Sequence, residues 1–182
     1  MAYQETLKTP AQRSDAIASM IRVNQAGEFG AKRIYAGQLA VMGDRTPAAR
    51  SIAHMAEQEE RHLSAFDKMM AERGVRPTIF HPVWDVAGFA LGAITAAIGP
   101  EAAMACTVAV ETEIDRHYAE QLHEIGDDDP ELSAMVADFQ ADELEHKATA
   151  LAEGAERAPA YPVLSAVIRL GCRTAIAVSK RI

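Results

Sequence analysis

The chain has 182 residues, which is enough for one domain with a sizeable core. Hydrophobic residues make up 49% of it but aromatic residues only 5%, and this composition favours helices over sheets. The formal net charge of −8 excludes a general nucleic-acid binder, which needs a basic surface to displace counterions from phosphates. We therefore expect a single all-α domain.

The first stretch of the chain, residues 1–13, is polar. It lacks the apolar core of a secretory signal, so we expect a flexible tail followed by one domain over residues 14–182. Cys106 and Cys172 are isolated in apolar contexts, without the close spacing of a metal or redox pair. We expect both to be buried thiols in a reducing compartment.

The first half of the domain, residues 14–73, predicts a helical hairpin. Ser14 can cap a long first helix that carries apolar residues along one side. Thr46 and Pro47 fit the N-cap and the first position of a second helix, and Gly74 ends it.

The most apolar part of the chain, residues 83–99, follows this hairpin. No charged residue occurs between Asp85 and Glu101. As a helix the uncharged run spans about 23 Å, less than the roughly 30 Å of hydrocarbon in a bilayer, so the pattern disfavours a transmembrane helix.

The second half predicts another hairpin, residues 100–155, and a last amphipathic helix, residues 160–182. Every charged residue after Glu156 is basic. In the last helix a stripe of basic residues can lie beside apolar ones, as in helices that rest on anionic lipid. The basic residues are Arg169, Arg173 and Lys180, and the apolar ones are Val163, Val167, Leu170 and Ile176.

The two hairpins repeat the same chemistry at an offset of 83 or 84 residues. The repeated types are a glutamate, a tyrosine seven residues beyond it, and a Glu-x-x-His pair whose side chains share one helix face. The repeat pairs Glu28 with Glu111, Tyr35 with Tyr118, Glu59 with Glu143, and His62 with His146. We infer a duplicated hairpin, and two such hairpins packed antiparallel form a four-helix bundle.

This bundle predicts a dinuclear metal centre. A glutamate from each of two helices and a Glu-x-x-His from each of the other two form the inward ligand set of ferritin-like di-iron and di-manganese proteins. Four carboxylates neutralise two divalent ions, and two imidazoles add nitrogen donors that suit iron. The predicted ligands are Glu28, Glu59, His62, Glu111, Glu143 and His146.

Other polar residues of these helices are not part of the predicted ligand set. Glu120 and His123 also form a Glu-x-x-His pair, but no glutamate precedes it at the repeated distance, so we expect a solvated face. Tyr35 and Tyr118 are expected in the core with their hydroxyls on a ligand glutamate or a water, and a redox role is the alternative. His117 lies either at the surface or beside a substrate. Further glutamates are expected at the surface or behind the ligands: Glu57, Glu60, Glu113 and Glu145.

Several segments resemble the demethoxyubiquinone hydroxylase family of ubiquinone biosynthesis. They are RVNQAGEFGA at residues 22–31, AMACTVAVE at 103–111, DELEH at 142–146 and GCR at 171–173. The resemblance covers nearly the whole chain from Ile17 onward. It implies a ferritin-like di-iron monooxygenase with every family ligand present, and it places His117 where the family has a histidine near the quinone ring.

The resemblance also implies a reaction, namely hydroxylation by O₂ of a polyprenylated methoxy-methyl-benzoquinol. Two iron ions per chain would serve as cofactor. NADH is the candidate reductant, passing electrons through the quinol because the sequence has no glycine-rich dinucleotide fingerprint. The alternatives are a quinol oxidase of the alternative-oxidase type and a ferritin-like iron-binding protein.

A polyprenyl quinol resides in the bilayer, so the resemblance further implies a peripheral membrane protein. Its location would be the cytoplasmic face of the cell membrane, or the matrix face of the mitochondrial inner membrane in an organelle. Residues 86–98 and the last helix are the candidate membrane surfaces. Partner proteins of ubiquinone biosynthesis and a homo-oligomer are both left open by the sequence.

Overall fold

The computed structural model describes residues 9–181, and no strand occurs among them. The elements are α1 (Pro10–Met42), α2 (Pro47–Arg73), α3 (His81–Ile98), α4 (Pro100–Ile125), α5 (Pro130–Ala152), the short 3₁₀ helix η1 (Ala155–Arg157) and α6 (Tyr161–Ser179). The predicted all-α fold is therefore confirmed. Most of the predicted flexible tail, residues 1–8, lies outside the described residues.

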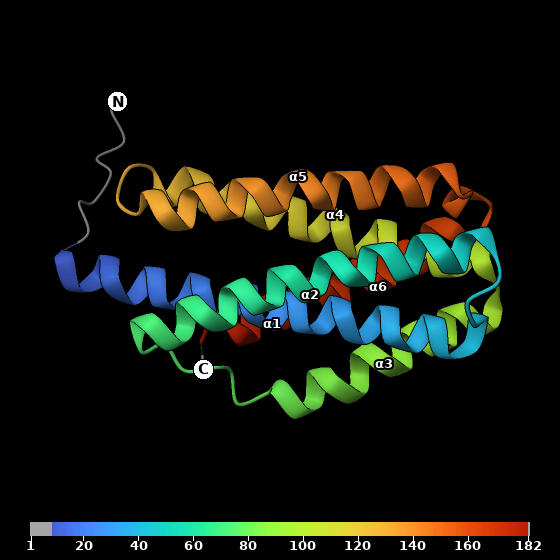
Figure 1. Ribbon diagram of the computed structural model, residues 1–182, viewed down its shortest axis with the longest axis horizontal. Coiled ribbons are helices and arrows are strands. Elements are labelled where there is room, and N and C mark those ends of the chain that lie inside the picture. Colours follow the sequence, from blue (N-terminus) through green and yellow to red (C-terminus); the bar gives the residue numbers. More distant parts are fainter. Residues whose placement is uncertain (1–8, 182) are drawn as a thin grey trace.

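Two helical hairpins form the central bundle (Figure 1). Helix α1 packs against α2 and α4 packs against α5, while α1 also contacts α4 and α2 contacts α5. The additional helices, α3 and α6, have their main contacts with α1 and α4. One side of the bundle, formed by α1 and α4, is thus covered by apolar helices, and α2 and α5 form the opposite side.

Helix α1 begins five residues earlier than the sequence suggested. Thr9 is the N-cap instead of Ser14, because its hydroxyl accepts a hydrogen bond from the Gln12 amide while the Gln12 side chain accepts one from the Thr9 amide. Residues 10–13 therefore belong to the helix and not to the tail. Thr46 caps α2 as predicted, by accepting a hydrogen bond from the amide of Ala49.

Glycines allow α3 to lie unusually close to α1. A Cβ added at Gly92 would lie 1.9 Å from the Ile34 carbonyl oxygen, and one at Gly37 would lie 2.1 Å from the Phe89 carbonyl oxygen. Any larger residue would push the two backbones apart. The uncharged segment thus has one face fixed on the bundle.

A buried carboxylate holds α6 on α4. Glu113, for which a surface position was one expectation, is completely buried and accepts hydrogen bonds from Arg169 and Arg173 of α6. Arg116 donates a further hydrogen bond to it from α4. Burial alone would raise the pKa of Glu113, but these guanidinium groups lower it to about 2. Two of the three residues in the predicted basic stripe therefore bind the bundle itself.

Candidate metal centre

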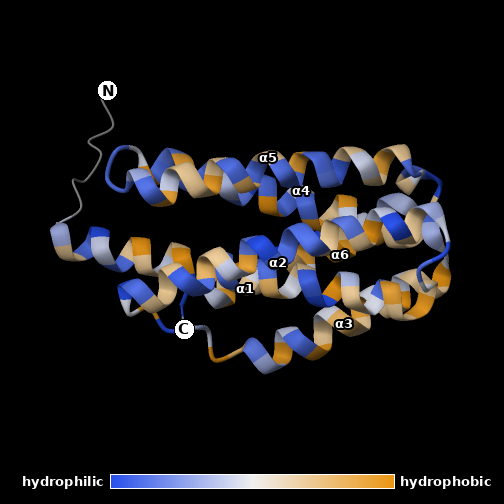
Figure 2. Ribbon diagram, in the orientation of Figure 1, coloured by the Kyte–Doolittle hydropathy of each residue, from blue (hydrophilic) through white to orange (hydrophobic). Residues whose placement is uncertain are grey.

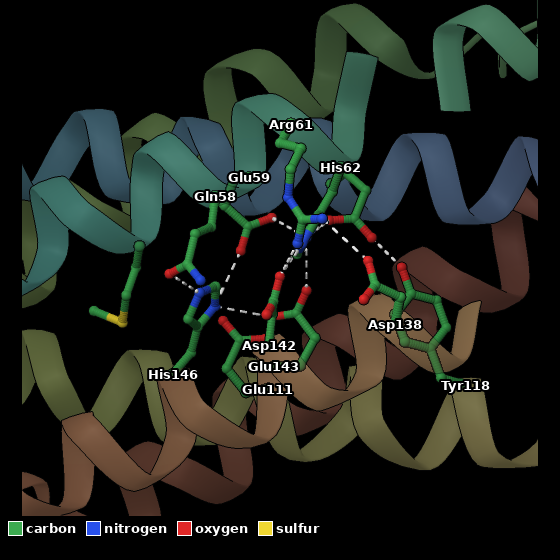
Figure 3. A network of polar contacts seen from close by, with 12 residues as sticks. Gln58, Glu59, Arg61, His62, Glu111, Tyr118, Asp138, Asp142, Glu143 and His146 are labelled. Atoms are coloured by element: carbon green, nitrogen blue, oxygen red, sulfur yellow. Dashed lines mark hydrogen bonds and ion pairs between the residues drawn. The ribbon is translucent and has the colours of Figure 1, made fainter. Parts of the chain in front are cut away.

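The six predicted ligands lie at mid-length in the bundle, between two apolar clusters. One cluster includes Tyr35 and Met55, and the other includes Phe66 and Tyr118. The predicted ligands are at most 1% exposed. They are Glu28 on α1, Glu59 and His62 on α2, Glu111 on α4, and Glu143 and His146 on α5. Figure 3 shows the side chains of those on α2, α4 and α5 pointing toward one another.

The donor atoms form two groups, and within each group they lie within 4.8 Å of one another. Both groups contain Glu59 and Glu143. The first is completed by Glu28 and His62, and the second by Glu111 and His146. Two ions could therefore be held side by side, with two shared carboxylates between them.

The shared carboxylates are oriented to bridge. For Glu143, Oε1 lies 3.2 Å from Nδ1 of His62 and Oε2 lies 3.0 Å from Nδ1 of His146. For Glu59, Oε2 lies 3.9 Å from Nδ1 of His62 and Oε1 lies 3.3 Å from Nδ1 of His146. Each carboxylate thus directs one oxygen toward each half of the centre.

The two remaining glutamates are held by tyrosines across the repeat. The hydroxyl of Tyr35 on α1 donates to Oε1 of Glu111 at 2.7 Å, and that of Tyr118 on α4 donates to Oε1 of Glu28. Burial, followed by the nearby carboxylates, raises the pKa of both tyrosines well above the ordinary value, so they remain protonated donors. Of the two partners expected for these hydroxyls, a predicted ligand glutamate or a water, the structure shows the glutamate.

The inward donor atoms fit a metal because they have no hydrogen-bond partner among residues 9–181. Within that range, eight buried atoms of the six predicted ligands lack one: Glu28 Oε2, both oxygens of Glu59 and of Glu143, Glu111 Oε2, and Nδ1 of His62 and of His146. Unpaired buried polar atoms are rare in proteins because each costs about 1 to 3 kcal/mol. Two divalent cations would satisfy these atoms and balance the four carboxylates.

The pKa shifts in the centre indicate an excess of negative charge. Burial and then the charge of Glu143 raise the pKa of Glu59 and of Glu111 well above the ordinary value. Burial alone would lower the pKa of His62, yet its contacts with Glu143 and Glu28 raise it to about 10. Without metal, protons therefore supply part of the positive charge that the carboxylates require.

The outer nitrogens of the two histidines have different partners, which the sequence did not reveal. Nε2 of His62 lies 2.9 Å from a carboxylate oxygen of Asp142, whereas Nε2 of His146 lies 3.1 Å from the amide oxygen of Gln58. Such contacts fix the orientation of histidine ligands. Their positions in the repeat could have indicated them, because Gln58 directly precedes Glu59 and Asp142 directly precedes Glu143. The two residues are therefore also 84 residues apart.

The residues with open roles also have clear positions. Glu120 and His123 are exposed, as expected for the unpartnered Glu-x-x-His. His117 is buried, so the surface alternative is wrong. Burial, followed by Lys180 and Arg116, lowers its pKa to about 4, which makes the imidazole neutral at pH 7.

His117 is part of a polar chain that reaches α1. Its Nε2 lies 2.8 Å from the side-chain nitrogen of Gln121, whose amide exchanges two 2.8 Å hydrogen bonds with Asn24. Because the amide nitrogen of Gln121 is a donor, Nε2 of His117 accepts and its proton is assigned to Nδ1.

Comparison with known families identifies this arrangement. The family model described as "Ubiquinone biosynthesis protein COQ7" matches residues 15–179. The chain belongs to the COQ7 family. A 3-demethoxyubiquinol 3-hydroxylase of Rhodospirillum rubrum is 52% identical over 166 residues, covering 91% of this chain and 78% of that protein.

More distant members of the COQ7 family match over a similar length. A human protein named NADPH-dependent 3-demethoxyubiquinone 3-hydroxylase, mitochondrial, is 49% identical over 171 residues, covering 92% of this chain and 78% of its own. The 5-demethoxyubiquinone hydroxylase, mitochondrial, of Saccharomyces cerevisiae is 40% identical over 189 residues, covering 93% and 81%.

Proposed function

We propose that this COQ7-family chain hydroxylates a polyprenylated methoxy-methyl-benzoquinol with O₂ in ubiquinone biosynthesis. The observation that carries the proposal is the pair of buried donor groups that share Glu59 and Glu143. The relatives' names support hydroxylation over the two alternatives, a quinol oxidase and an iron-binding protein, because each of the three relatives is named as a hydroxylase.

Two iron ions are the cofactor that we propose for the centre. When bound, such a pair activates O₂ by supplying electrons to it. The mixed carboxylate and imidazole set suits iron, and the two groups of donor atoms support a pair of ions. Tyr35 and Tyr118 orient the carboxylates of Glu111 and Glu28 by hydrogen bonds, and Glu59 and Glu143, which belong to both donor groups, would hold both ions.

The reaction requires an external reductant. One oxygen atom enters the quinol ring and the other leaves as water, and this water takes up two electrons and two protons. We propose a reduced nicotinamide dinucleotide as their source. The sequence suggested NADH, whereas the human relative is named NADPH-dependent, so a comparison of the two donors at equal concentration is needed.

We propose that the substrate ring lies near His117. A neutral imidazole, held by Gln121 and protonated on Nδ1, can exchange a hydrogen bond with a quinol hydroxyl without adding a buried charge. Asn24 extends this polar chain to α1 and fixes the amide of Gln121.

The apolar tail of the substrate requires a membrane surface, which we propose α3 and α6 provide. Both helices are long and apolar enough to cross a bilayer by length and composition alone, yet each has a face on the bundle. Figure 2 colours much of α3 as hydrophobic. Exposed apolar residues are Val83, Val86, Ile94 and Ile98 on α3, and Val163, Val167 and Leu170 on α6.

We therefore propose that the protein binds peripherally to the cytoplasmic face of a cell membrane. If it belongs to an organelle, as the word mitochondrial in the names of the human and yeast relatives suggests, we propose the matrix face of the inner membrane. Flotation with anionic vesicles tests this. Val86→Glu and Leu170→Glu should reduce the bound fraction, whereas Leu151→Glu, an exposed apolar residue of α5, should not. Equal recovery of all three variants with the vesicles would contradict the proposal.

The reaction itself is tested by the mass of the product. After a single turnover of the reduced, iron-loaded protein with the quinol and ¹⁸O₂, we expect one labelled oxygen atom in the ring. Formation of the quinone alone would support the oxidase. Binding of many iron atoms per chain, instead of two, would support the iron-binding alternative.

A further inference from the structure

The two halves of the centre differ in how they are shielded from solvent along the seam of α2 and α5. Beside His62 the guanidinium of Arg61 crosses the seam and binds both Asp138, at 3.0 Å, and Asp142 (Figure 3). The ring of Phe139 stacks on His62 with a centroid separation of 4.0 Å. This half is closed by an ion-pair network and an aromatic ring.

The half that contains His146 opens into a pocket. A cavity of about 260 Å³ lies between α2 and α5, and the histidine itself forms part of its wall. The lining residues are Arg50, Ser51, His54, Met55, Gln58, Glu145, His146 and Thr149. A volume of this size accommodates several water molecules, so a hydrated ion can enter it.

The internal repeat explains why only one half is closed. At the offset of 84 residues, Asp138 corresponds to His54 and Arg61 corresponds to Glu145. The acid and base that form the closing ion pair are thus replaced by an imidazole and a carboxylate, and both of these are exposed. No guanidinium crosses the seam at the corresponding position, because that position is Glu145.

We propose that this pocket is the port through which divalent metal ions reach the centre. It offers the carboxylate of Glu145 and the imidazole of His54 at its mouth, and it ends at His146, whose Nδ1 is one of the orphaned donors. The four buried carboxylates beyond it attract a cation. Arg50 also lines the pocket and carries a positive charge. Its guanidinium donates a hydrogen bond to the Arg45 carbonyl at 2.9 Å, which holds that charge at the N-terminal end of α2.

The opposite side of the centre is a poor route for an ion. There α1 and α4 are covered by α3 and α6, and the residues between them form an apolar cluster that includes Ile34, Val110 and Ile168. A divalent ion would have to lose its water among hydrocarbon side chains, at a large free-energy cost.

Metal loading of the full-length, metal-free protein tests the port. Co²⁺ added in a stopped-flow instrument is followed by its visible absorbance, and the ions per chain are counted at the end. The double variant His54→Asp/Glu145→Arg copies the closing ion pair into the open half. We expect its loading to be about tenfold slower, with two ions per chain still bound.

Two further variants separate closure from charge. Glu57→Arg makes the same change of charge as Glu145→Arg, at an exposed position of α2 that does not line the pocket, and we expect loading near the wild-type rate. Glu145→Arg alone should slow loading and supplies the test if circular dichroism shows that the double variant is misfolded. His54 and Glu145 are both exposed, so the fold should tolerate their substitution.

The outcomes separate this proposal from the one on which it rests, the dinuclear centre. Loading of the wild type and of the Glu145→Arg variants at the same rate would overturn the port, while leaving two bound ions and the centre intact. Equal slowing by Glu57→Arg would also overturn it, because charge alone would then explain the effect. Failure of the wild type to bind Co²⁺ would refute both proposals.

Discussion

Replacement of Glu59 by glutamine is expected to stabilise the metal-free protein while removing its capacity to be stabilised by metal. In the fold this carboxyl is fully buried and its pKa is raised well above the ordinary value, first by burial and then by the charges of Glu143, Glu28 and Glu111. Glutamine retains the shape of the side chain and removes this electrostatic penalty, but an amide cannot bridge two cations as a carboxylate does.

The size of the effect follows from the ordinary pKa of 4.5 for Glu59. Protonating this carboxyl at pH 7 costs about 1.4 kcal/mol for each pH unit between its ordinary pKa and 7, or about 3 kcal/mol. This is the largest penalty that burial can impose, because a carboxyl with a higher cost of remaining charged takes up a proton instead. The buried amide of glutamine lacks hydrogen-bond partners, which costs about 1 kcal/mol and reduces the gain in stability by that amount. We therefore expect the free energy of unfolding of the metal-free variant to exceed that of the wild type by up to about 2 kcal/mol.

The pH dependence has a defined sign. A carboxyl with a raised pKa binds more protons in the folded than in the unfolded state, so its contribution to stability is present below pH 4.5 and is lost as the pH rises toward the folded-state pKa. The advantage of Glu59→Gln should therefore grow as the pH increases from about 5 to 7.

Urea unfolding at pH 7, followed by circular dichroism, measures both parts of this prediction. With a chelator present the variant should be more stable than the wild type. With metal at about a hundredfold excess over the dissociation constant, the wild type should gain about 3 kcal/mol per site and the order should reverse. The control is Glu57→Gln, at an exposed position of the same helix. A metal-free Glu59→Gln variant that is less stable than the wild type would refute the reasoning.

Three further predictions concern single residues. His146→Ala should remove at least one bound iron and abolish turnover, whereas His123→Ala, at the exposed Glu-x-x-His, should leave both near normal; equal losses would refute the choice of site. The pKa of His117 is lowered to about 4 in the folded protein, so between pH 6.5 and 4.5 the unfolded state binds more protons than the folded state. The wild type should therefore lose about 2 kcal/mol of stability as the pH falls through this range. Urea titrations of His117→Gln should lack this loss. Glu113→Gln, which removes the carboxylate that binds two arginines of α6, should cost about 2 kcal/mol and increase hydrogen exchange in α6 before the bundle helices.

The positions of the centre could be predicted because helix periodicity and the repeat restrict them together. Residues three apart on one helix must share a face, so Glu59 with His62 and Glu143 with His146 could only act as pairs. These inferences needed no knowledge of how the helices are rotated. The repeat also placed Tyr35 and Tyr118 near a predicted ligand glutamate or a water, but that their partners belong to the other hairpin is known only from the structure.

Other features depended on tertiary contacts that the sequence does not specify. Arg169 and Arg173 have a spacing that suits anionic lipid equally well, and only the buried position of Glu113 directs them to the bundle. The start of α1 was wrong because Ser14 and Thr9 are both good N-caps, and the reciprocal hydrogen bonds with Gln12 decide between them.

The shielding of the centre was also beyond the sequence. Asp142 was visible as part of the DELEH segment, but its contact with His62 on the other hairpin requires the two helices to be placed side by side. The replacement of Asp138 by His54 and of Arg61 by Glu145 could be found only after the repeat was aligned, and the open half could be found only from the pocket.

The most direct test of the account is a single turnover in which iron content and product mass are measured on the same sample. We predict two iron ions per chain, held by Glu28, Glu59, His62, Glu111, Glu143 and His146, and one atom of ¹⁸O in the ring of the quinol product. A protein that binds two iron ions but returns only quinone, or that adds oxygen equally well after removal of the iron, would contradict the account.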